Sequence, residues 1–347
     1  MVSVSSVTES NGSSVSNTLR IVAVSTGMVA LAFTLNNYLI FWQGWPGLTS
    51  LVSHLGWFGA EPLRAPLASS AVTLGFLQLA SYALTILIVI GLTLRRAGRT
   101  MTTDADLLIS IAAYIARAAF WAVLLVGLTD MVISFLRVEG VLASLLGESL
   151  STQLGRAIYR GTYIHYPLIG VSLVIAWFSR SLGFTWLALL IVLAEFQIVL
   201  ARFIFSYEQA FMGDLVRFWY AALFLFASAY TLIEEGHVRV DILYAGMAER
   251  KKAWTNVLGS LFLGVPLCWI ILVSGMWDKS NLINAPLLSF EVTQSGYGLY
   301  VKYLMAGFLL VYALTMLMAF LGYLLRNAAV LNRDPDARPI GASHGAP

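Results

Sequence analysis

The sequence predicts an all-α integral membrane protein with about eight transmembrane helices and both termini in the cytoplasm. Of its 347 residues, 59% are hydrophobic and only 11% are charged, and the mean hydropathy is +0.80. Soluble domains have about 25% charged residues, so this composition excludes an ordinary soluble protein. The long apolar runs give the number of helices, and the basic residues at their ends give the orientation.

Eight segments are long and apolar enough to cross a hydrocarbon core of about 30 Å, which takes about 20 helical residues. The third is long enough to tilt or to project beyond the membrane. The fourth is the shortest and contains Pro167. The expected spans are 19–42, 70–94, 106–136, 162–178, 185–205, 215–233, 254–277 and 299–325.

The basic residues in the short loops set the orientation, because cytoplasmic loops carry an excess of Lys and Arg. Basic clusters follow the second, fourth, sixth and eighth spans, which all end on one side. We expect that side to be the cytoplasm. Residues 1–17 carry no basic residue and therefore lack the charged start of a cleavable signal peptide.

Two polar tails and two four-helix halves make up the expected domain organisation. Residues 1–17 and 327–347 are expected to be disordered tails. The turn at residues 180–183 divides the remainder into an N-terminal part, 18–182, and a C-terminal part, 183–326. No convincing internal repeat relates the two halves, so the sequence does not indicate an inverted-repeat transporter.

Charged side chains inside the spans are rare, because burying a charge in lipid costs several kcal/mol, and they raise a functional hypothesis. Arg117 and Asp130 of the third span are separated by about 20 Å along one helix and cannot pair with each other. Glu195 of the fifth span is the expected partner of Arg117. These charges form either an ion or substrate path or structural ion pairs; we favour the pairs, because Gly and Pro interruptions in corresponding spans are missing.

Residue patterns of known catalytic, metal and cofactor sites are missing. Only His165 of the four histidines lies in or near a span, so paired haem ligands are not expected. The single cysteine, Cys268, excludes an intrachain disulfide. Nucleophile elbows, zinc-ligand clusters and phosphate-binding glycine loops are also missing. We expect no enzymatic activity, no catalytic residue, no metal and no cofactor, and the small net charge of +3 gives no support for nucleic-acid binding.

The densest group of ionisable residues is the segment 234–243, which lies between two apolar runs. It contains Glu235, His237, Arg239 and Asp241. One interpretation is an extended entry, Asp241 as a helix N-cap, and a helix along the membrane surface. The alternative is a plain polar turn whose basic residues fix the topology.

This segment, followed by Arg-Lys-Lys-Ala-Trp at 250–254, resembles the signature of the small permease subunit of TRAP (tripartite ATP-independent periplasmic) transporters, the DctQ-like family. The resemblance covers about residues 184–326. Matching positions at helix ends or candidate interfaces are Arg202, Asp214, Arg217 and Glu291.

The resemblance implies a scaffold subunit in the bacterial inner membrane. Family members bind a larger permease subunit, which holds the sodium and substrate sites, while a periplasmic binding protein delivers an organic acid. Residues 18–182 have no counterpart in short family members, and we expect them to extend the scaffold or to cover a face that lipid covers elsewhere. The alternatives are a stand-alone secondary transporter or channel that uses Arg117, Asp130 and Glu195, and an anchor subunit of a redox complex. The substrate is not identified.

Overall fold

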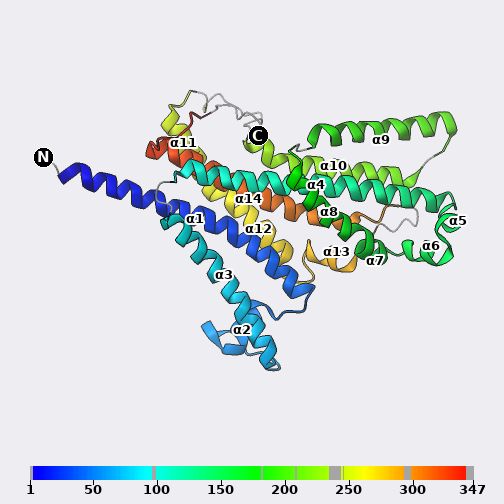
Figure 1. Ribbon diagram of the computed structural model, residues 1–347, viewed down its shortest axis with the longest axis horizontal. Helices are drawn as coiled ribbons and strands as arrows, with labels where there is room; N and C mark the ends of the chain where they lie inside the picture. Colours follow the sequence, from blue (N-terminus) through cyan, green and yellow to red (C-terminus); the bar gives the residue numbers. More distant parts are fainter. Residues whose placement is uncertain are drawn as a thin grey trace. The chain divides into compact units, whose positions relative to one another are not determined.

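The computed structural model describes residues 3–95, 99–180, 183–207, 209–233, 244, 246–292 and 298–340. Within these ranges every regular element is a helix (Figure 1). The elements, in chain order, are α1 (Ser3–Phe41), α2 (Gly47–Leu55), the 3₁₀ turn η1 (Trp57–Gly59), α3 (Ser69–Arg95), α4 (Met101–Val138), α5 (Leu142–Leu146), α6 (Glu148–Leu154), α7 (Ala157–Arg160), the π turn η2 (Gly161–His165), α8 (Tyr166–Phe178), α9 (Phe184–Phe205), α10 (Ala210–Ile233), α11 (Glu249–Gly259), the π turn η3 (Ser260–Gly264), α12 (Val265–Met276), α13 (Asn284–Ser289) and α14 (Lys302–Asn332).

Eight helices within the described ranges are long and apolar enough to cross a membrane, which confirms the predicted all-α membrane fold. They are Val15–Phe41, Ser69–Arg95, Met101–Val138, Ala157–Phe178, Phe184–Phe205, Phe211–Ile233, Glu249–Met276 and Lys302–Asn332. Several extend beyond the predicted spans, because a helix continues through polar residues where its apolar stretch ends. The cytoplasmic location of the termini stays a prediction.

The chain forms two compact units, and each unit combines segments that are far apart in the sequence. Unit 1 contains the described residues of Met1–Ile109, Arg239–Leu267 and Phe320–Ala342. Unit 2 contains those of Ser110–Val238 and Cys268–Ala319. The boundary predicted at residues 182 and 183 falls inside unit 2, so compactness and the sequence pattern divide the chain differently.

Unit 1 is held together by polar contacts as well as by apolar packing. Arg20 of α1 forms a buried ion pair with Asp104, with 2.7 Å between Nε and Oδ2. Asn36 of the same helix donates to the Ser81 hydroxyl of α3 at 3.0 Å. These contacts give the Arg20 guanidinium and the Asn36 amide nitrogen partners inside unit 1, as buried polar groups require.

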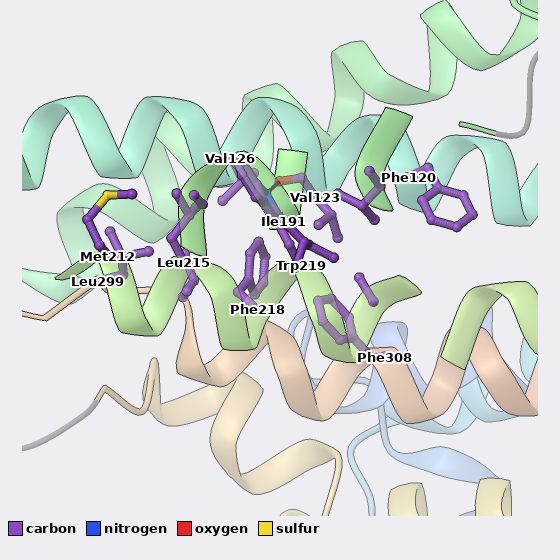
Figure 2. Close-up of a cluster of buried hydrophobic side chains, with 14 of the residues drawn as sticks. Phe120, Val123, Val126, Ile191, Met212, Leu215, Phe218, Trp219, Leu299 and Phe308 are labelled. Atoms are coloured by element: carbon purple, nitrogen blue, oxygen red, sulfur yellow. Dashed lines mark hydrogen bonds between the residues drawn. The ribbon is translucent and has the colours of Figure 1, made fainter. Parts of the chain in front are cut away.

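Unit 2 has a large aromatic and aliphatic core between α4, α9, α10 and α14 (Figure 2). Trp219 of α10 lies against α4 and donates its indole N–H to the Val123 carbonyl at 3.3 Å. Gly127 makes this approach feasible, since a Cβ there would lie only 2.5 Å from the Trp219 indole nitrogen. The buried members of the core are Phe120, Val123, Val126, Leu187, Ile191, Ala194, Phe211, Met212, Leu215, Phe218, Trp219, Ala222, Phe226, Leu299, Val301 and Phe308.

Each of the two π turns in the described ranges is followed by a proline. Pro167 comes two residues after η2, and Pro266 comes two residues after η3. Proline lacks the backbone N–H and clashes with the carbonyl four residues earlier in a regular helix. A π turn changes the local hydrogen-bond pattern, so these helices continue through the membrane span instead of ending at the proline.

Candidate functional site

A fully buried group of polar side chains lies inside unit 2, and we call it the Asp130 cluster. Its members are Asp130 and Ser134 of α4, Arg160 of α7, His165 of η2 and Tyr303 of α14. Each of the five is 0% exposed. Because a charge in such a place is costly unless it is paired, the arrangement of their hydrogen bonds decides what the cluster does.

Both carboxylate oxygens of Asp130 are occupied. Its Oδ1 accepts from Arg160 Nη1 at 2.7 Å and lies 3.2 Å from His165 Nε2. Its Oδ2 accepts the backbone N–H of Tyr300 at 2.7 Å. The carboxylate therefore connects α4, the α7–η2 helix and the segment that leads into α14.

The remaining polar atoms of the cluster are arranged around the same centre. Arg160 also donates from Nη1 to the Ser134 hydroxyl at 3.1 Å and from Nε to the Leu154 carbonyl at 2.5 Å. Its guanidinium carbon lies 4.3 Å from the centroid of the Tyr300 ring, a favourable cation–π contact. Nη2 has no hydrogen-bond partner among the described residues.

Both ring nitrogens of His165 lie within hydrogen-bond distance of a partner. Its Nδ1 lies 2.9 Å from the Tyr303 hydroxyl. With the proton on Nε2, the ring donates to Asp130 and accepts at Nδ1 from Tyr303, which satisfies both nitrogens. The cluster then holds one negative and one positive charge, both of them paired.

The π turn η2 explains why Arg160 and His165 meet the same carboxylate. They are five residues apart, a separation that places side chains on different faces of a regular α-helix. In a π turn the hydrogen bond runs between residues five apart, so residue i+5 takes the place that residue i+4 has in an α-helix. Gly161 lies between them, where a Cβ would overlap the Phe290 ring.

Two carboxylates hold the segment that leads into α14. Asp130 accepts the N–H of Tyr300, and Asp214 of α10 accepts the N–H of Leu299 at 3.2 Å. Both acids lie close to the N-terminus of α14, where the helix dipole favours negative charge. One acid comes from the N-terminal part of the chain and the other from the C-terminal part, so α14 is fixed to both.

Of the three predicted intramembrane charges, only Asp130 has a partner among the described residues. Arg117 forms no ion pair there, and its Nε is buried without a hydrogen-bond partner. Glu195 is exposed on α9. The Phe120 ring packs against Phe184, with 4.8 Å between centroids. From this contact, Glu195 lies about 16 Å along α9 in one direction, and Arg117 lies about 4.5 Å along α4 in the opposite direction. The expected pairing of Glu195 with Arg117 is therefore not found.

The positions at helix ends form contacts at the surface. Arg217 pairs with Asp214 at 3.4 Å, and its side chain is 73% exposed. Glu291 pairs with Lys302 at 2.5 Å, with both side chains about half exposed. Arg202 is exposed near the end of α9. The loop residues Glu235, His237, Arg239 and Asp241 lie outside the described residues, so their predicted cap and partner contacts stay predictions.

Sequence reasoning missed most of the buried polar residues, among them Arg160, His165 and Arg20. It left Arg160 in an outer loop, because the fourth span was expected to begin at residue 162, whereas the helix begins at Ala157. It considered His165 only as a haem ligand, and it did not consider Arg20 although that residue falls inside the first span. The sequence does contain a signal for two of them: Arg160 comes just before an apolar run that contains His165 and Pro167.

One comparison with known proteins gave a match. Residues 188–330 match the family model described as "Tripartite ATP-independent periplasmic transporters, DctQ component". No match was found among curated proteins or among solved structures. The matched segment begins in α9 and ends in α14, so it contains Asp214, Tyr300 and Tyr303 but neither Asp130 nor Arg160.

Proposed function

We propose that the chain is the small permease subunit of a tripartite ATP-independent periplasmic transporter, because residues 188–330 match the family model of the DctQ component. In this role it supports a larger permease subunit in the bacterial inner membrane. The larger subunit carries out sodium-coupled uptake of an organic acid that a periplasmic binding protein delivers. The chain itself has no catalytic role and needs no cofactor.

The Asp130 cluster supports a static role for unit 2. A transported ion needs ligands that it can reach and leave, whereas both oxygens of Asp130 are bound to groups of the chain itself. The same contacts fix α4, which precedes the family segment, to the start of α14 within it. We interpret the N-terminal part of unit 2 as an enlargement of the scaffold.

The surface of α9 supports a partner in the membrane. Its large apolar side chains are widely exposed, and on the side of Glu195 they include Val192, Val199 and Phe203, which are 62%, 47% and 82% exposed. Glu195 and Arg202 lie on this helix two turns apart, and Glu195 would otherwise face lipid. We propose that this face of α9 packs against the larger subunit and that Glu195 pairs with a donor there.

Co-purification tests the proposed interface on α9: the amount of larger subunit recovered with the tagged chain is measured. Glu195→Gln is expected to lower that recovery at least fivefold while the amount of inserted chain stays the same, because the variant removes the buried charge pair and keeps the helix. Glu148→Gln is the matched control, since Glu148 is an exposed glutamate on α6 outside the spans. Equal recovery for Glu195→Gln and the control would contradict the interface.

A transport assay tests the role as a whole. The purified chain, reconstituted alone in liposomes, is expected to take up no organic acid under a sodium gradient. Uptake by the chain alone would contradict the scaffold role and favour the stand-alone transporter or channel. Neutral variants of Arg117, Asp130 and Glu195 would then identify which charges carry the transport.

A further inference from the structure

An apolar cavity of about 280 Å³ lies between α4 and α9 in unit 2. Phe120, at one end of the core cluster, forms part of its wall (Figure 2). Its lining is Phe120, Trp121, Leu124, Gly183, Trp186, Leu187 and Leu190, with no charged or hydroxyl-bearing side chain. A space of this size is near the lower end of ligand pockets, about 300–1,000 Å³, and apolar walls hold water poorly.

The cavity lies at the end of α9 that marks one boundary of the membrane. The 22 residues of α9 span about 33 Å, close to the thickness of the hydrocarbon core. Gly183, which lines the cavity, is the N-cap residue of α9. The two tryptophans of the lining therefore lie near the depth at which indole rings meet lipid headgroups.

A positively charged side chain, that of Arg117, lies just beyond the cavity on the side of this membrane boundary. Arg117 precedes Phe120, Trp121 and Leu124 by three, four and seven residues, so it belongs to the same stripe of α4. With the start of α9 taken as the boundary, Arg117 lies nearer the headgroups than the predicted span 106–136 placed it, and its side chain leans toward the helix N-terminus, away from the middle of the hydrocarbon. It has no ion-pair partner in the described part of the chain, and its Nε is buried without a hydrogen bond.

A second basic residue, Arg180, lies three residues before Gly183 and is exposed. The site thus has an apolar slot inside the hydrocarbon and unpaired positive charge at its headgroup end. We propose that it binds one phospholipid, with an acyl chain in the cavity and the phosphate on Arg117. The bound lipid joins α4, which precedes the family segment, to α9, in which that segment begins, and this role does not depend on the proposed transport function.

Native mass spectrometry of the purified full chain tests the site. The chain is stripped of lipid and titrated with dioleoyl phosphatidylglycerol, and separately with dioleoylglycerol, which has the same chains and no phosphate. We expect the phospholipid to bind at least fivefold more tightly. Arg117→Gln should remove that preference, and Leu124→Trp, which fills the cavity, should weaken binding of both lipids at least fivefold.

Matched controls separate a site from general lipid adhesion. Arg156→Gln changes an exposed arginine elsewhere in unit 2, and Leu173→Trp enlarges an exposed leucine on α8; both should bind as the unaltered chain does. If Leu124→Trp does not give a monodisperse protein, Leu190→Phe takes its place. Equal binding of the two lipids by the unaltered chain, or unchanged binding by Arg117→Gln and the cavity-filling variant, would overturn the proposal.

Discussion

Replacing Asp130 with asparagine removes the negative charge of the Asp130 cluster and keeps the size of the side chain. Arg160, which is 0% exposed, then remains charged without its ion-pair partner. Breaking a buried pair in this way costs about 3–5 kcal/mol. For domains of about 150–250 residues 1 kcal/mol shifts the melting temperature by roughly 2–4 °C, so we expect a loss on the order of 10 °C.

Labelling of the Cys268 thiol on heating measures this loss of stability. Cys268 is the only cysteine of the chain, it belongs to unit 2, and it is 1% exposed. A maleimide dye that fluoresces on reaction should therefore label the folded protein slowly and the unfolded protein fast. The midpoint of labelling on heating, measured in detergent, reports the stability of the unit that contains Asp130.

A double variant tests whether the loss comes from the unpaired charge. Asp130→Asn combined with Arg160→Met removes both charges, so no unpaired charge stays buried, and keeps an oxygen at position 130 that accepts the Tyr300 N–H. We expect it to regain at least half of the loss. Glu148→Gln, on the exposed surface, should leave the midpoint nearly unchanged. A midpoint for Asp130→Asn equal to that of the control, or additive losses in the double variant, would refute the reasoning.

Two further predictions concern unit 2. Gly161→Ala should lower the labelling midpoint by several degrees, because its Cβ would overlap the Phe290 ring, whereas Gly170→Ala, with nothing within 4 Å of its Cβ, should not; equal effects would mean that the helix near Phe290 adjusts freely. Lys302→Gln should change the midpoint little, because the exposed pair with Glu291 contributes under about 1 kcal/mol, and a loss as large as that of Asp130→Asn would show that this pair does more than its exposure indicates.

The membrane spans were predictable because apolar length is a local property of the sequence. The second and fifth spans agree with the helices found to within one residue at both ends, and all eight candidates are helices. In each of the other six, one end differs by four to seven residues, and the helix of the fourth span begins at Ala157 rather than at residue 162. Arg160 lies in that added turn, and a charged residue at the edge of an apolar run looks like a loop residue until its partner is known.

The Asp130 cluster was only partly predictable because its contacts are long-range. The cost of a charge in the membrane singled out Asp130, and the preference for an ion pair over a pathway was the favoured interpretation. Its partners, however, depend on the π turn between Arg160 and His165 and on the approach of Tyr303 from a helix more than 130 residues later. Periodicity along one helix does not contain this information.

Asp130 and Asp214 accept the backbone N–H groups of the neighbouring residues Tyr300 and Leu299. Asp130 precedes the segment that matches the family model, and Asp214 lies within it. The segment that matches the family model therefore does not coincide with unit 2. Unit 2 takes its core from α4 as well as from α9, α10 and α14. A fragment cut at the family boundary would expose Trp219 and Phe226, which contact Val123 and Phe120 of α4 in the whole chain. The matched segment thus shares its core with a helix that lies outside the match, and an isolated fragment of it would lack part of that core.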